Sequence, residues 1–229
     1  MEQLKQAIQY HSNPVKAKLL ARYFKTGKGE YGEGDIFLGL TVPESRKIAK
    51  QFSSISLNEL KYHLQSKFHE ERLIALLILV DKYQKTKSKE IVDFYLSNTK
   101  SINNWDLVDL TSHKILGNYL LDKDKSILFK LTNSENIWER RIAIISTFAF
   151  ISQNNFKDSL KIAEILINDK HDLIHKAVGW MLREIGKRNQ PVLENFLKQK
   201  YKKMPRTMLR YAIEKFPEAI RKKYLKGEI

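Results

Sequence analysis

The sequence predicts an all-α protein made of repeated helix pairs, and three observations support this class. No stretch alternates apolar and polar residues for long enough to indicate a β-strand. Helix-start signals are frequent: a capping asparagine followed by proline at residues 13–14, and capping boxes at residues 41–44 and 56–59. The third observation is an internal repeat. We expect helices near residues 13–24, 41–52, 56–65, 69–85, 88–97, 104–121, 124–131, 135–152, 156–168, 171–188, 190–200, 205–215 and 217–225.

A small residue recurs in the second helix of four expected pairs, at a position where two helices must pack closely. Ala143, Ala177 and Ala212 follow one another at intervals of 34 and 35 residues, and Ala75 precedes Ala143 by 68 residues. Periods of this length are typical of helical-pair solenoids, and the signature residues of tetratricopeptide repeats are absent. We therefore predict a single domain over residues 1–229: an all-α, right-handed solenoid of HEAT-like antiparallel helix pairs with a concave basic groove.

The one long interruption is glycine-rich. Residues 25–40 contain five of the nine glycines in the chain. This segment lacks the preceding strand and the G-K-[ST] ending of a phosphate-binding loop. Its acidic residues, Glu30, Glu33 and Asp35, would repel phosphate. We expect residues 25–40 to form a surface loop that does not bind nucleotides.

The charge balance favours a polyanionic partner. The formal net charge is +15 and the pI is about 9.7. Nucleic acid is the commonest soluble polyanion, and a lysine-rich surface without such a partner is the alternative. Because the chain has no cysteine, disulfides and thiolate zinc sites are excluded.

No membrane segment is expected. The longest apolar run, residues 73–80, is far shorter than the roughly 20 residues of a membrane span. The N-terminus lacks the basic-then-apolar pattern of a signal peptide. We expect a cytoplasmic protein, associated with the nucleoid when it is bound to DNA.

Residues 102–113 carry the first candidate site. Trp105, Asp109 and His113 are four residues apart and share one face of a helix. Asp109 also occupies the position at which the repeat predicts an alanine. Because burying an unpaired carboxylate costs several kcal/mol, Asp109 either faces a groove or has a partner. The alternatives are a salt bridge to a neighbouring repeat and a repeat alignment that is wrong by one residue.

The three tryptophans of the chain lie on successive second helices. Trp138 and Arg141 are three residues apart, as are Trp180 and Arg183, so each pair shares a helix face. A single tryptophan is more often a core residue. Three at related positions, each near a charged residue, favour an aromatic and basic groove.

At these residues the sequence resembles the AlkD-type DNA alkylation repair glycosylases, which are built from HEAT-like repeats. It departs from them at Asn104, where some members carry a second tryptophan, and in its long glycine-rich loop. The matching segments are residues 21–25 (A-R-Y-F-K), 37–39 (F-L-G), 42–44 (V-P-E), 105–109 (W-D-L-V-D), 136–138 (N-I-W) with Arg141, and 176–184 (K-A-V-G-W-M-L-R-E).

The resemblance implies a monofunctional DNA glycosylase. Such an enzyme hydrolyses the N-glycosidic bond of cationic purines such as N3-alkyladenine and N7-alkylguanine in double-stranded DNA, without a deep pocket for a flipped base. By this resemblance Asp109 is the catalytic carboxylate. The DNA-binding residues implied by it are Trp105, Trp180 and Tyr23 beside the lesion, Arg141 on the DNA backbone, and Arg183 and Arg46 as further phosphate contacts.

No metal ion or other cofactor is expected, and the protein would act as a monomer. Residues 171–175 (H-D-L-I-H) only superficially match the H-E-x-x-H zinc motif and have no evident third ligand. His113 could orient Asp109, although a core or surface histidine is the simpler interpretation. The alternative functions are a non-catalytic DNA-binding HEAT-like protein and a protein–protein scaffold.

Overall fold

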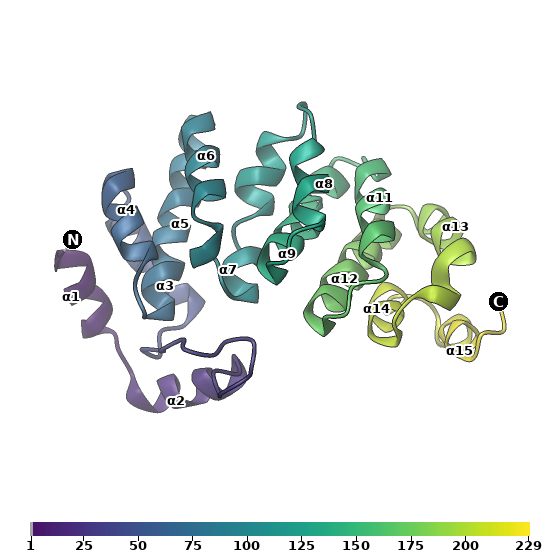
Figure 1. Cartoon of the computed structure of the whole chain (residues 1–229), viewed down its shortest axis with the longest axis horizontal. Helices are drawn as coiled ribbons and strands as arrows, with labels where there is room; N and C mark the ends of the chain where they lie inside the picture. The colour runs from purple at the N-terminus through teal and green to yellow at the C-terminus, as the bar shows by residue number, and fades with distance from the viewer. Residues whose placement is uncertain (1) are drawn as a thin grey trace. The chain divides into compact units, whose positions relative to one another are not determined.

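The computed structural model describes residues 2–229, and these residues contain no β-strand (Figure 1). A single isolated bridge pairs Ile36 with Phe68. The all-α class is therefore confirmed, whereas the handedness of the solenoid and its groove stay predictions. The helices are α1 (Glu2–Tyr10), α2 (Pro14–Tyr23), α3 (Val42–Gln51), α4 (Leu57–Leu64), α5 (His69–Thr86), α6 (Lys89–Ser97), α7 (Trp105–Asp109), α8 (Ser126–Thr132), α9 (Ile137–Ser146), α10 (Phe148–Ser152), α11 (Lys157–Leu166), α12 (Asp172–Arg188), α13 (Gln190–Lys200), α14 (Arg206–Ala212) and α15 (Glu218–Lys226).

The helices belong to two compact units, Met1–Thr111 and Ser112–Ile229, called here the first and the second unit. The organisation of residues 1–229 as a single domain stays a prediction. In the part of the chain that the structure describes, no helix combines the length and the apolar character needed to cross a membrane.

The core of the first unit is built around α5. Residues 73–80 are apolar on every face of this helix and all are buried. A helix that is apolar all round must be covered on all sides. Accordingly α1, α3, α4 and α6 pack against α5, whereas α2 has no buried residue and lies at the edge of the unit (Figure 1).

The core of the second unit is centred on α12, which packs against α9, α11, α13 and α14. The approach of α14 is close because of Gly179, where an added Cβ would lie 2.5 Å from the Met208 carbonyl oxygen. Ala143 and Ala177 are fully buried, and Ala212 is 1% exposed. The repeating alanines therefore occupy close-packed positions, as the sequence predicted.

Two long helices expected from the sequence are interrupted. The helix expected at 104–121 ends as α7 at Asp109, where the Thr111 hydroxyl donates to the Leu107 carbonyl at 2.5 Å. The helix expected at 135–152 divides at Thr147, whose hydroxyl donates to the Ile144 carbonyl at 2.7 Å. Such side-chain bonds compete with the helical ladder, which explains both breaks.

Two smaller departures are an additional N-terminal helix and a π-helical turn. The N-terminal helix α1 has no counterpart among the expected helices, although Leu4 and Ile8 on one face are buried. Between α7 and α8, residues 113–117 form a π-helical turn in which the Gly117 N–H donates to the Ser112 carbonyl at 2.9 Å.

The glycine-rich segment is only partly a surface loop. Residues 25–34 are largely exposed, but Asp35, Phe37 and Leu40 are buried, which corrects the expectation for residues 25–40. The Glu70 carboxylate at the start of α5 accepts the backbone N–H groups of Leu38, Gly39 and Leu40. These bonds satisfy loop N–H groups that burial removes from water.

Candidate active site

Trp105 begins α7 and lies in an aromatic cluster with Tyr23 and Phe24 at the end of α2. The Trp105 ring stacks on Phe24 at 4.8 Å with an interplanar angle of 8°, and it meets the edge of Tyr23 at 6.0 Å. Phe24 is buried, Trp105 is half-buried and Tyr23 is 65% exposed. The structure thus brings two predicted site residues together on an accessible surface of the first unit.

Asp109 lies one helical turn after Trp105 and is half-buried. Beneath it lies the fully buried Tyr95, whose hydroxyl is 3.1 Å from the Thr111 hydroxyl. Burial raises the pKa of Tyr95, and the negative charge of Asp109 adds to this effect. The catalytic carboxylate predicted from the sequence therefore borders the core without being enclosed by it.

Below the aromatic cluster lies a buried ionic cluster, formed by Asp35, His69, Arg72 and Asp106. The two ring nitrogens of His69 are each 2.9 Å from a carboxylate oxygen, Nδ1 from Asp35 and Nε2 from Asp106. Arg72 donates to the other Asp35 oxygen at 2.5 Å. All four side chains are less than 10% exposed, so two acids and two bases balance one another inside the protein.

The charges of the ionic cluster are stabilised mutually. Burial disfavours the charged ring of His69, but the charges and hydrogen bonds of Asp106 and Asp35 outweigh it and raise the pKa of His69 to about 9. Burial likewise disfavours ionised Asp35, but the His69 hydrogen bond and the Arg72 charge hold the pKa of Asp35 below its ordinary value. At neutral pH the cluster therefore holds four charges.

Asn104 joins the ionic cluster to α7. Its Oδ1 accepts the Trp105 N–H at 2.8 Å as the helix cap, and its Nδ2 donates to Asp35 at 3.2 Å. The residue is fully buried. A tryptophan at this position, as some relatives of the predicted family have, would not fit in these surroundings without a rearrangement.

In the second unit, Trp180 on α12 is half-buried and neighbours other aromatic rings. Its ring lies 6.2 Å from Phe148, which in turn meets His113 at 5.4 Å. The Trp180 Nε1–H donates to Glu184 at 3.2 Å. Trp138, in contrast, is 6% exposed, which corrects the expectation that all three tryptophans line a groove.

The predicted phosphate-binding arginines have three different environments. Arg46 on α3 is exposed. Arg183 on α12 is paired with Glu214 and lies 3.5 Å from Glu184. Arg141 on α9 is 5% exposed and donates to the Leu173 carbonyl, so a phosphate contact requires its guanidinium to reach the surface from a buried position.

The family model for the DNA alkylation repair enzyme matches residues 4–216. The chain belongs to this family. Membership supports a role in DNA repair and enzymatic activity, and it implies that the protein acts on DNA.

Solved structures agree with the family in fold. The chain superimposes on a predicted DNA alkylation repair enzyme from Enterococcus faecalis with a TM-score of 0.73 at 21% identity, covering 90% of this chain and 97% of that one. AlkD2 from Streptococcus mutans gives a TM-score of 0.59 at 18% identity, covering 94% and 99%. No curated protein matches the chain significantly.

Histidines 171 and 175 of this family member have structural roles. The His171 ring accepts the Leu173 N–H at 3.1 Å and so caps α12, and His175 contacts the Asp169 carbonyl. Among residues 2–229 no group of three or more histidine, cysteine or acidic side chains is arranged to hold a metal ion.

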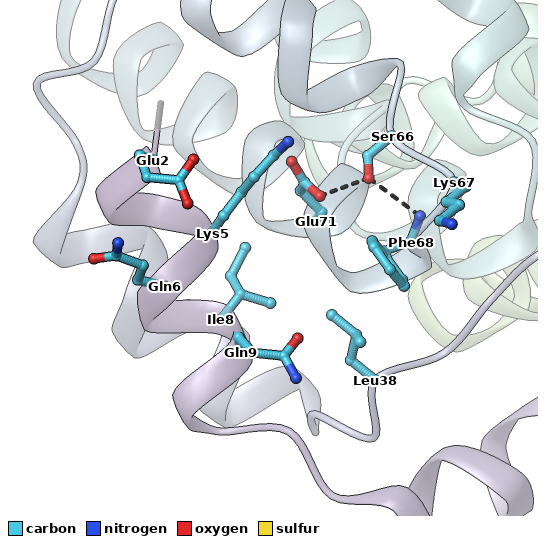
Figure 2. Close-up of a pocket in the computed structure, with 10 residues that line it drawn as sticks. All are labelled: Glu2, Lys5, Gln6, Ile8, Gln9, Leu38, Ser66, Lys67, Phe68 and Glu71. Carbon is cyan, nitrogen blue, oxygen red and sulfur yellow. Dashed lines mark hydrogen bonds between the residues drawn. The ribbon is translucent and has the colours of Figure 1, made fainter.

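A cleft of about 470 Å³ lies beside α1 in the first unit (Figure 2). Its wall includes Glu71, which accepts a hydrogen bond from the Ser66 hydroxyl at 2.5 Å, and Phe68, whose N–H donates to the same hydroxyl. None of the predicted site residues lines this cleft.

Two features of the site were not predicted from the sequence. The first is the ionic cluster, whose signal was the polar segment of residues 69–72 directly before an apolar run that had to be buried. The second is an exposed apolar stripe on α2: Val15, Leu19 and Tyr23 are four residues apart and 65–71% exposed. The spacing alone would have revealed that stripe.

Proposed function

We propose that this family member is a monofunctional DNA glycosylase that hydrolyses the N-glycosidic bond of cationic alkylated purines in double-stranded DNA. The observation that carries the proposal is the placement of Asp109 and Trp105. The carboxylate is half-buried one turn from a half-buried tryptophan, beside the exposed Tyr23. The side chains of Trp105 and Asp109 are thus both accessible to a ligand on one surface of α7.

The chemistry of the lesion explains why one carboxylate is enough. A purine alkylated at N3 or N7 carries a positive charge and leaves without protonation by a general acid. As the bond breaks, positive charge develops on the sugar near C1′. The Asp109 carboxylate would stabilise that charge and orient the attacking water, as carboxylates do in glycoside hydrolysis.

Aromatic side chains would favour the charged lesion. The face of an indole attracts cations by about 0.5–2 kcal/mol, so Trp105 and Trp180 would bind a cationic purine more strongly than a neutral base. Tyr23 adds an exposed ring at the edge of Trp105. Most of the selectivity would come from the lability of the cationic leaving group, so neutral lesions such as hypoxanthine should not be released at a comparable rate.

Charge would supply the affinity for the DNA backbone. The net charge is +15, and α2 carries Lys16, Lys18 and Arg22 without an acidic residue. Arg46 is already exposed, whereas Arg183 would exchange its glutamate partners for phosphate. Binding should therefore weaken steeply as salt increases.

The test is the release of 7-methylguanine from methylated duplex DNA by the wild type and by Asp109→Asn. We expect the substitution to abolish release and to leave the dissociation constant for DNA almost unchanged, because the amide keeps the shape but loses the charge. The matched control is Asp93→Asn on α6, an exposed aspartate paired with Lys89, which should behave as the wild type.

Three outcomes would contradict the proposal. If Asp109→Asn still releases 7-methylguanine, the carboxylate is not catalytic. If the wild type binds DNA in a salt-dependent way but releases no alkylated purine, the protein is a non-catalytic DNA-binding member of the family. Binding with a flat salt response would instead indicate a protein scaffold.

A further inference from the structure

The ionic cluster places a charged side chain directly under the residues of the proposed site. We propose that His69, held as an imidazolium between Asp35 and Asp106, is a positioning residue that fixes α7 and so presents Trp105 and Asp109 to DNA. The functional part of this inference rests on the proposed glycosylase activity, whereas the structural part can be measured without it.

The geometry is that of a charged ring between two carboxylates. Both ring nitrogens lie 2.9 Å from carboxylate oxygens, and an ionised carboxylate can only accept a hydrogen bond. With both carboxylates ionised, each nitrogen carries a proton and the ring is an imidazolium. A neutral imidazole would present a lone pair to one of the two aspartates, and one hydrogen bond would become a repulsive contact.

α7 depends on such external contacts. It has five residues, and an isolated helix of that length is not stable in water. Besides the burial of Leu107 and Val108 in the core, three contacts hold it: the Asp106 carboxylate on His69, the Asn104 cap that also donates to Asp35, and the stacking of Trp105 on Phe24. Two of these three contacts end in the ionic cluster.

His69 also supports the aromatic cluster directly. Its ring stacks on Phe37 at 4.4 Å and lies 5.1 Å from Phe24, the ring on which Trp105 stacks. A cation next to aromatic faces is favourable, so the protonated ring strengthens these contacts. The chain of contacts from His69 through Phe24 to Trp105 is therefore continuous.

The charged groups around His69 define what its titration would do. Asp35 faces it from the glycine-rich segment and Asp106 from α7, while Arg72 on α5 is bound to Asp35. The neighbouring acids of α5 are engaged elsewhere: Glu70 with the backbone after Phe37, and Glu71 with His63 and Ser66.

Loss of the His69 proton would leave two buried carboxylates and a single cation, Arg72, which is bound to Asp35. The cluster would then carry an excess of buried negative charge, and one of the two aspartates would lose its hydrogen bond to His69. Since α7 has little intrinsic stability, we expect it to loosen and Trp105 to become more accessible. The pKa of His69 near 9 places this change above neutral pH.

The experiment compares His69→Gln with His63→Gln. His63 is a matched control, because it is also fully buried and also bound to a carboxylate, Glu71 at 2.7 Å. Within residues 2–229, His63 forms no hydrogen bond or ring contact with α7 or with the aromatic cluster. Thermal unfolding curves are recorded first for both variants. The readouts below are then measured at a temperature at which both variants are folded.

The first readout is the accessibility of Trp105, measured by acrylamide quenching in a background with Trp138→Phe and Trp180→Phe. In otherwise unaltered protein we expect quenching to be low at pH 7 and to rise with a midpoint near the pKa of His69. In His69→Gln quenching should be high and independent of pH. In His63→Gln it should follow the wild-type curve.

The second readout is the side-chain NMR signal of His69, which should show two protonated nitrogens at pH 7. Asp106→Asn provides a further variant that keeps the shape of the cluster. It should lower the midpoint of the His69 titration and the midpoint of Trp105 quenching together. Excision by His69→Gln should fall by about 100-fold, the loss that a misplacement of about 1 Å can cause.

The inference is overturned if the His69 ring has a single protonated nitrogen at pH 7, or if Trp105 is quenched alike in His69→Gln and His63→Gln. If His69→Gln does not fold, the same decision rests on whether the two midpoints move together in Asp106→Asn. If the wild type excises nothing but the quenching results hold, the proposed glycosylase activity fails and the positioning role of His69 stands.

Discussion

Trp105 and Trp180 lie on helices that the chain holds in place by different means. α7 has five residues and depends on a buried set of four charges, whereas α12 has 17 residues and packs through apolar side chains, Ala177 and Gly179. A histidine beside each helix shows the same difference. Both ring nitrogens of His69 contact carboxylates beside α7, while the His171 ring accepts a backbone N–H at the start of α12.

This difference separates two kinds of stability. Apolar packing does not depend on pH, and a long helix satisfies most of its own backbone. A buried charge cluster is stable only while every member keeps its charge, so it fails when one partner is removed or titrated. The first unit therefore combines the proposed catalytic carboxylate with the more sensitive support.

The largest effect should follow from removing a buried charge. Asp106→Ala leaves the His69 imidazolium with one partner and should lower the free energy of unfolding by about 3–5 kcal/mol. Asp172→Ala, the equivalent change in the first turn of α12, removes an exposed pair with Lys176 and should cost less than about 1 kcal/mol. Denaturant titration of both variants at pH 7 measures this contrast, which equal losses would contradict.

The next effect is a pH dependence confined to the first unit. The folded pKa of His69, about 9, exceeds the ordinary value of 6.5, so its contribution is complete below pH 6.5 and is lost as pH rises through 9. The loss should be about 3 kcal/mol. Amide hydrogen exchange, corrected for its intrinsic pH dependence, should show this loss of stability in α5 and α7. The His69→Gln variant should not show the pH-dependent loss. A similar loss in α12 would contradict the assignment.

A steric change in the second unit should be smaller and independent of pH. Gly179→Ala places a Cβ 2.5 Å from the Met208 carbonyl oxygen and should cost about 1–3 kcal/mol. In Gly186→Ala the nearest atom is the end of the Leu193 side chain, which can move, so this control should cost less. Thermal unfolding at pH 7 and pH 9 tests whether Gly179→Ala costs more stability than Gly186→Ala and whether both costs are independent of pH.

The smallest effect concerns the cap of α12. Burial lowers the pKa of His171, so its capping bond is present above pH 6.5 and is lost as pH falls through the folded pKa, opposite to the response of His69. His171→Ala should cost about 1 kcal/mol at pH 8. His171→Asn should retain the cap and remove the acid sensitivity. Unfolding curves at pH 5 and pH 8 measure the contribution of the cap to stability. A contribution that is larger at pH 5 than at pH 8 would contradict this prediction.

Much of the fold could be predicted because it depends on local pattern. The proline and capping boxes of α2, α3 and α4 mark helix starts that the structure confirms, with the capping bonds in place. The repeating alanines predicted close packing, and all of them are buried. The breaks at Asp109 and Thr147 were missed, because a hydroxyl that bonds to its own helix leaves no distinct signal in the sequence.

The candidate site was predicted only in part. The spacing of Trp105 and Asp109 on one face follows from helix geometry alone. The ionic cluster was missed because Asp35 and Asp106 are 71 positions apart in the chain, and nothing local indicates that both meet His69. Trp138 was misjudged for a related reason: a helix has several faces, and only packing decides which of them is covered.

By itself the sequence determined the helical class, the repeat of small residues, the basic charge and the pairing of Trp105 with Asp109 on one helix. These depend on interactions between residues that are close in the chain or on composition. Only the tertiary structure decided that Asp35 is buried, that α7 is five residues long and that both ring nitrogens of His69 face a carboxylate. The physical reason is that burial and ionisation depend on neighbours brought together by folding, and a charge excluded from water persists only where such neighbours balance it.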